Sequence, residues 1–181
     1  LTFPIITLVA AFTNLFGTGG TPLFSIARGR GQHERAEKIM GNVFTLLLGS
    51  SVLIFAFCYL FRKPVLYLFG ASEASYVYAD AYLQIYLFGT TCSMLATGMN
   101  GFINAQGFPG IGMLTTVIGA VPNLILDPVF IFVLHMDVRG AALATVISQT
   151  VSGIWAVHFL TRGKSLLKLK ISGMRLEGRL V

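Results

Sequence analysis

Asp127 is the residue whose type and position point most directly to chemistry. It is the only Asp, Glu, Lys or Arg in the stretch 111–135, whereas the six other acids lie in loops or at the ends of apolar stretches. It stands about eight residues from the outer end of this stretch, or ~12 Å along a helix. A carboxylate at that depth in a membrane costs about 2.5–3.5 kcal/mol on insertion scales. We therefore expect Asp127 to face a cavity or a partner and to have a functional role.

The neighbours of Asp127 strengthen this expectation. Asn123 stands four residues earlier, on the same face of a helix. Pro122 and Pro128 lack an N–H, so the carbonyls four residues before them lose their helical donors. Carboxylate, amide and carbonyl oxygens suit a small hard cation. Burial also favours the protonated form of a carboxylate, which suits reversible protonation. Asp127 is thus predicted to switch between a cation-bound or protonated state and a free state.

Three further residues are candidates for the same site. Thr145 lies about six residues, or ~9 Å, into the apolar stretch 139–161. Its hydroxyl and the Ala141 carbonyl could reach Asp127 if the helices pack closely, which the small residues of 140–144 allow. The alternative is a Thr145 hydroxyl bonded only to its own helix. Asn100 lies near the inner end of its apolar stretch, so a simple hairpin places it well below Asp127.

Helices that cross a membrane must position these residues. The chain has 181 residues, of which 55% are hydrophobic and only 11% charged, with a mean hydropathy of +0.77. Soluble domains carry about 25% charged residues. This composition excludes an ordinary soluble globule, a disordered chain and a fibrous repeat. A membrane helix needs about 20 apolar residues. The sequence therefore predicts an all-α polytopic membrane helix bundle with five spans, at roughly 1–27, 40–61, 77–103, 111–135 and 139–161.

Two connections between the spans are distinctive. The charge-free stretch 81–126 is too long for one helix, and the Gly- and Pro-containing segment 104–110 is expected to break it with a tight turn. Residues 64–76 are interpreted as an interfacial connection. The glycines of 17–20 are expected to let helices approach closely.

The distribution of Lys and Arg predicts the orientation. The loop after the first span and the tail after the fifth together hold ten basic residues, whereas the loops on the opposite side hold three. The positive-inside rule places the ten in the cytoplasm, so residue 1 lies outside and the tail inside. We expect residues 162–181 to be a solvated cytoplasmic linker, with docking on anionic lipid as the alternative. Because the chain begins at Leu1 and runs straight into apolar sequence, we expect its beginning to be missing.

Other chemistries find little support. Cys58 and Cys92 lie in apolar runs and are interpreted as small buried hydrophobic residues. The spacing of the three histidines matches no metal motif. The net charge of +6 flanks membrane spans, so no nucleic-acid partner is expected.

An ordered set of motifs resembles the N-terminal lobe of multidrug and toxic compound extrusion (MATE) transporters, in particular the bacterial and archaeal branch related to DNA-damage-inducible efflux proteins. The strongest are Asn-Leu-Ile-Leu-Asp-Pro at 123–128 and Gly-Ala-Ala-Leu-Ala-Thr at 140–145. Weaker similarities lie at 22–31, 69–72, 97–100 and 105–109.

The resemblance implies twelve helices in two lobes and a multi-pass protein of the cell membrane. It implies that residues 1–161 are part of the N-terminal lobe, holding helices two to six, and that 162–181 link the lobes. The first helix, where the family carries another important Asp, and the second lobe would then be absent from this chain. The resemblance makes Asp127 the central acid and Asn123 and Thr145 polar ligands, with the Ala141 carbonyl as a possible one. Asn100 matches a further polar position of the same network.

The implied activity is export of small organic cations or drugs, driven by entry of Na+ or H+ through alternating access. The protein would be no enzyme and would hold no cofactor besides its coupling ion. The main alternative is a flippase for lipid-linked saccharides, which would line its cavity with Arg or Lys, and no such residue lies deep in any span. An intramembrane aspartyl enzyme would need two deep carboxylates. A non-transporting scaffold would leave Asp127 as an unexplained cost.

Overall fold

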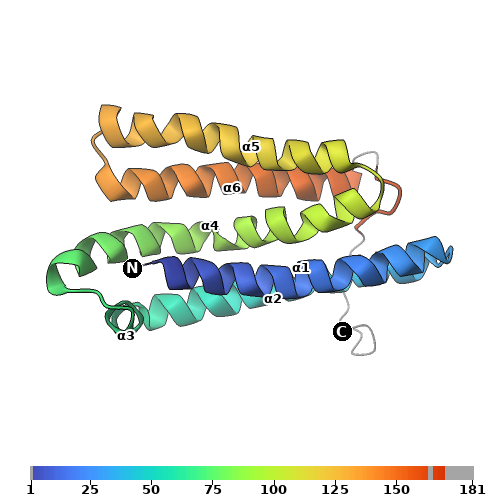
Figure 1. Cartoon of the computed structure of the whole chain (residues 1–181), viewed down its shortest axis with the longest axis horizontal. Coiled ribbons are helices and arrows are strands. Elements are labelled where there is room, and N and C mark those ends of the chain that lie inside the picture. Colours follow the sequence, from blue (N-terminus) through green and yellow to red (C-terminus); the bar gives the residue numbers. More distant parts are fainter. Residues whose placement is uncertain (1, 163–164, 170–181) are drawn as a thin grey trace.

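The computed structural model describes residues 2–162 and 165–169, and within these ranges the chain is helical with short connections (Figure 1). The elements are α1 (Phe3–Gly29), α2 (His33–Leu60), α3 (Arg62–Leu68), α4 (Glu73–Ala105), α5 (Pro109–Pro128), the π-helix η1 (Val129–Val133) and α6 (Asp137–Arg162). The long helices run back and forth along one axis (Figure 1). The predicted all-α membrane bundle is therefore confirmed.

Four of the described helices are long and apolar enough to cross a membrane: α1, α2, α5 continued by η1, and α6. The fifth expected span corresponds to α4, which has 33 residues but no stretch as apolar as those of the other four long helices. It packs against each of these four helices. Thr90 is fully buried among them, whereas Thr97 and Asn104 are exposed.

The connections differ in detail from the sequence prediction. Residues 64–76, interpreted as an interfacial connection, instead include the short helix α3 and the first turn of α4. The turn expected over 104–110 is confirmed but shorter, since α4 continues to Ala105 and α5 starts at Pro109. Gly107 occupies a left-handed backbone conformation there, with φ of +90°, which a residue with a side chain rarely adopts.

Small residues allow the helices to approach closely. A Cβ atom on Gly17 of α1 would lie 2.9 Å from the Cα of Gly98 on α4, and one on Gly153 of α6 would lie 2.8 Å from the carbonyl oxygen of Cys92. Gly140, at the start of α6, packs in the same way against Phe130 of η1. The close packing expected of Gly17 and Gly140 is therefore confirmed, whereas nothing lies within 4 Å of a Cβ atom on Gly19 and the contact at Gly153 was not predicted. Such packing allows backbone contact between helices that lack a hydrophobic driving force in lipid.

The α1–α2 turn, the α4–α5 turn and the last residue of α6 all lie at one end of the bundle, which we call the basic end (Figure 1). Two of these connections are tied together, because Nη1 of Arg28 donates a hydrogen bond to the carbonyl of Ala105. The sequence analysis had placed the basic loop and the tail on one side of the membrane, and the helix order agrees.

Residues 165–169, which we call the strap, fold back onto the basic end. Leu167 and Leu169 are each only 6% exposed. The backbone N–H of Leu167 donates to Oε1 of the buried Gln106 at 3.0 Å, and that of Leu169 donates to the carbonyl of Leu160 at 2.9 Å. The expectation of a solvated linker is therefore wrong for Ser165, Leu167 and Leu169, which are buried, whereas Leu166 and Lys168 are exposed. The rest of the predicted linker beyond Arg162 lies outside the described residues.

At the opposite end, a polar cluster joins α3 to α4. Nε of Arg62 lies 3.4 Å from Oδ1 of Asp80, and Nε2 of Gln84 donates to Oδ2 of Asp80 at 2.7 Å. The guanidinium of Arg62 also lies 5.3 Å from the ring centroid of Tyr59. An ion pair this exposed contributes at most about 1 kcal/mol.

Candidate functional site

Asp127 stands where the geometry of its helix changes. It is followed by Pro128, the last residue of α5, and then by η1, in which the N–H of Leu134 bonds the carbonyl of Val129 five residues back at 3.0 Å. The helix passes through Pro122 and widens into π geometry after Pro128. Short π segments of this kind are frequent at functional sites.

The carboxylate of Asp127 is incompletely paired. Its Oδ1 atom is shielded from solvent and has no hydrogen-bond partner among the described residues. A buried oxygen without a hydrogen bond costs the free energy of its desolvation, and this cost is larger for a charged oxygen than for a neutral one. A bound cation or a proton would supply the partner that Oδ1 lacks.

Three of the predicted site residues meet at the α5–α6 contact. Nδ2 of Asn123 lies 3.4 Å from Oγ1 of Thr145, to which it donates, and Oγ1 of Thr145 donates to the carbonyl of Ala141 at 3.0 Å. The Thr145 hydroxyl thus bonds its own helix and also accepts from the neighbouring one. The own-helix bond that was weighed as the alternative is therefore present, but it is joined by the bond from Asn123, and among the described residues the Thr145 hydroxyl makes no hydrogen bond to Asp127.

Tyr82 of α4 joins the same group and was missed by the sequence analysis. Its phenol lies near the Thr145 side chain and the Asp127 carboxylate. Its ring stacks on that of Tyr86, with centroids 5.8 Å apart and planes inclined by 16°. The available signal was depth: Tyr82 is about five residues, or ~8 Å, into the expected span 77–103, close to the ~9 Å of Thr145 in its own span. We refer to Asp127, Asn123, Thr145, Ala141 and Tyr82 as the cage.

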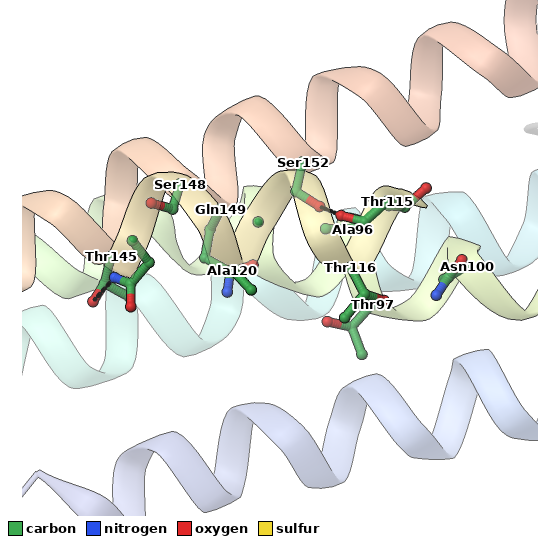
Figure 2. A pocket seen from close by; sticks show the side chains of 12 residues that line it. Ala96, Thr97, Asn100, Thr115, Thr116, Ala120, Thr145, Ser148, Gln149 and Ser152 are labelled. Carbon is green, nitrogen blue, oxygen red and sulfur yellow. Dashed lines mark hydrogen bonds between the residues drawn. The ribbon is translucent and has the colours of Figure 1, made fainter. Parts of the chain in front are cut away.

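A cavity of about 320 Å³ adjoins the cage on the side of the basic end (Figure 2). Asn100, Asn123 and Thr145 all line it, whereas neither Asp127 nor Ala141 does. The structure therefore brings Asn100 into one cavity with two cage residues, and no direct contact joins Asn100 to Asp127. The depth argument from the sequence was correct in that respect.

The residues that line this cavity are uncharged and many carry a hydroxyl or amide group, although most of the surface that they expose to it is apolar. They come from α4, α5 and α6 and include no Lys, Arg, Asp, Glu or aromatic side chain; the residues are Ala96, Thr97, Asn100, Thr115, Thr116, Gly119, Ala120, Asn123, Thr145, Ser148, Gln149 and Ser152. One bond across it fixes the helices, since Oγ of Ser152 donates to the carbonyl of Thr115 at 2.8 Å. The arrangement offers hydroxyl and amide groups to water or to a small cation.

This fold defines a polytopic membrane helix bundle. A family model described as MatE matches residues 1–129. The chain therefore belongs to the MatE family, and it is a multi-pass membrane protein.

Named relatives agree with this assignment. The multidrug export protein MepA of Staphylococcus haemolyticus (strain JCSC1435) is 30% identical over 171 residues, which cover 94% of this chain and 38% of the relative. MepA of Staphylococcus aureus (strain MRSA252) is 25% identical over 176 residues, again 38% of its length. The chain thus spans about two fifths of the length of these relatives.

Solved structures share the fold. An inward-facing multidrug resistance MATE family transporter of the MOP superfamily gives a TM-score of 0.92 at 23% identity over 99% of this chain and 41% of its own. Its outward-facing form gives the same score and identity, over 40% of its own length. The Vibrio cholerae MATE transporter VcmN in the bent form gives 0.81 at 29% identity, over 96% of this chain and 40% of that one.

Proposed function

We propose that this chain is the N-terminal lobe segment of a cation-coupled antiporter that exports small organic cations by alternating access. Na+ or H+ is the coupling ion, and no resident cofactor takes part. The names of the relatives support the export of drugs, and their greater length supports a second lobe outside this chain. The lipid bilayer is the surrounding partner.

The observation that carries the proposal is the unpartnered Oδ1 of Asp127 within the cage. A bound cation or proton removes the cost of this buried charge, and the surrounding oxygens of Asn123, Thr145, Tyr82 and the Ala141 carbonyl are of the kind that hard cations prefer. Occupation of the cage then favours whichever state of the transporter binds the ion better.

Alternating access requires that this lobe serve two states of the transporter. The chain has a TM-score of 0.92 against both an inward-facing and an outward-facing structure. One lobe fold is thus compatible with both arrangements, which supports movement of whole lobes against each other. We place the basic end in the cytoplasm by the positive-inside rule.

The test is efflux of a fluorescent organic cation by the intact transporter that contains this chain, with Na+ and pH varied separately. For Asp127→Asn we expect a loss of gradient-driven efflux of about tenfold or more, equivalent to at least ~1.4 kcal/mol of lost coupling. The amide keeps the size of the side chain but neither carries the charge nor binds a proton at neutral pH.

The matched control is Asp80→Asn, which removes a carboxylate that pairs with Arg62 and Gln84 and is not part of the cage. It should keep efflux close to wild type. Full activity of Asp127→Asn would reduce Asp127 to a structural acid and end the proposal. Absence of wild-type efflux with every dye would favour the flippase, against which the uncharged cavity argues.

A further inference from the structure

The cavity extends well beyond the cage, toward the basic end. In Figure 2, Thr145 and Asn100 lie at opposite ends of the row of lining side chains, with Gln149 and Thr116 between them. Asn100 is about five residues, or ~8 Å, from the end of α4 at the basic end. Thr116 is ~10 Å from the start of α5 at the same end. The lining therefore covers most of the distance between the cage and the basic end.

A glycine lets α4 and α5 approach closely beyond the Asn100 end of this row. A Cβ atom on Gly112 of α5 would lie 1.9 Å from Oδ1 of Asn104 and 2.9 Å from Oδ1 of Asn100. Both amide oxygens of α4 therefore lie over the backbone of α5 where it has no side chain. Asn104 does not line the cavity, but it is exposed and is the last residue but one of α4, so amide groups continue from Asn100 to the surface at the basic end.

Two polar atoms in this row of lining side chains have no hydrogen-bond partner among the described residues. Oδ1 of Asn100 and Oγ of Ser148 are shielded and make no hydrogen bond among the described residues, and Ser148 is only 1% exposed. Buried polar groups of this kind are normally satisfied by protein or by ordered water. A cavity of this size and polarity has room for several water molecules.

We propose that this cavity is the inner passage of the coupling cation, a hydrated path between the cage and the basic end in which Gln149, Thr116 and Asn100 hold the ion in transit. The proposal rests on the proposed function, since it presumes that an ion binds at Asp127. The cage binds the ion, and the passage connects the cage to the cytoplasm.

The lining matches a small cation better than the exported drug or an anion. Hydroxyl and amide oxygens replace part of a hydration shell, and no basic side chain repels positive charge. No aromatic side chain is present to stack on an organic cation. The absence of acids also matters, because an ion in transit must be held weakly enough to leave.

The test is cysteine accessibility in the intact transporter, on a background in which Cys58, Cys92 and any other cysteine are replaced by Ala. Thr116→Cys and Gln149→Cys are introduced singly and treated with a membrane-impermeant cationic methanethiosulfonate in inside-out and right-side-out vesicles. Val151→Cys is the matched control on α6, since Val151 is exposed but does not line the cavity.

We expect both cavity cysteines to react about tenfold or more faster from the basic end than from the opposite face, because a charged reagent crosses an apolar environment only at high cost. Val151→Cys should react slowly from either side. Labelling of Thr116→Cys should also slow cation-driven efflux, whereas labelling of Val151→Cys should not.

Three results would overturn the passage: no reaction of either cysteine, reaction only from the opposite face, or equal reaction from both faces, as in a central drug cleft. Because two cysteine variants are tested separately, the result still holds if one of them fails to fold. The outcome is separate from that of the proposed function, because labelling reports access of water and needs no active Asp127. If labelling occurs from the basic end but the Asp127→Asn variant stays fully active, the cavity is hydrated and the proposal that an ion binds at Asp127 is rejected.

Discussion

The Thr145 hydroxyl has two partners that belong to different helices. It accepts from Asn123 of α5 and donates to the Ala141 carbonyl of its own helix. It also faces Tyr82 of α4. A single side chain thus links the three helices that surround Asp127, and its oxygen is a candidate ligand for the coupling ion.

Replacing Thr145 by Val keeps the shape of the side chain and removes this oxygen. We expect the cation concentration for half-maximal efflux to rise about 5- to 30-fold, since one hydrogen-bonding oxygen near a charge contributes ~1–2 kcal/mol. Thr145→Ser should restore most of the affinity. Cation-dependent efflux measures the change.

The control on the same helix is Thr150→Val. The Thr150 hydroxyl bonds only the Val146 carbonyl, at 2.7 Å, and the residue does not line the cavity. Its removal should leave cation affinity unchanged. Equal effects of the two valine variants would mean that α6 stability, and not the cage, governs the result.

At the scale of elements, the crossing of α1 and α4 depends on two facing glycines. A Cβ atom on Gly17 would lie 2.9 Å from the Cα and 3.0 Å from the carbonyl oxygen of Gly98. These are backbone atoms, which cannot rotate away as a side chain can. The two helices must therefore separate to admit a methyl group.

We expect Gly17→Ala to destabilise the folded protein by about 1–3 kcal/mol, the usual cost of overpacking. Gly19→Ala is the matched control, because nothing lies within 4 Å of a Cβ atom at that position. It should be neutral or stabilise α1 by up to about 1 kcal/mol through helix propensity. Thermal unfolding in detergent compares the two; a Gly17→Ala variant as stable as wild type would contradict the close crossing.

The sequence predicted the bounds of the helices better than it predicted which helices pack against one another. Charge-free stretches give the spans to within a few residues, except that α2 begins at His33, seven residues before the expected start, since a helix continues into charged sequence once it leaves the bilayer. The burial of α4 followed from contacts between helices distant in sequence, which periodicity does not reveal.

The candidate site was predicted in the same uneven way. Asn123 and Asp127 share one helix face, so their proximity follows from spacing alone. The Asn123–Thr145 contact required a guess about packing, and its geometry supports that guess. Tyr82 was missed because an aromatic residue in an apolar span gives no local sign of a polar contact. The roles of Asp127, Asn123, Thr145, Ala141 and Asn100 in ion coupling stay predictions.

At the scale of the whole molecule, the strap joins three helices at the basic end. Its backbone bonds Gln106, the residue directly after α4, and Leu160 of α6, and the N–H of Lys168 donates to Oε1 of Glu37 on α2 at 3.4 Å. Gln106 is 1% exposed, so its bond to Leu167 is protected from water. Any force applied to the chain beyond the strap is thus shared among α2, α4 and α6.

Replacing Gln106 by Leu removes the acceptor for the Leu167 N–H. We expect hydrogen exchange of the strap to accelerate about 5- to 100-fold, since a lost buried hydrogen bond costs ~1–3 kcal/mol. Gln32→Leu is the control, because the Gln32 side chain bonds only the exposed Arg35, at 3.4 Å. Hydrogen exchange followed by mass spectrometry gives the comparison, and unchanged exchange in Gln106→Leu would show that the buried leucines alone hold the strap.

The position of α5 at the side of the bundle has a consequence for biosynthesis. Only Gly112 and Thr115 of α5 are buried, and the helix contacts α4, α6 and η1. The ribosome completes α5 before α6, so Asp127 enters the bilayer when Tyr82 is its one available cage partner outside α5. The broad contact between α4 and α6 forms only afterwards. We therefore expect α5 to lie beside α4 in the translocon until α6 is inserted and brings Thr145 and Ala141 to the cage.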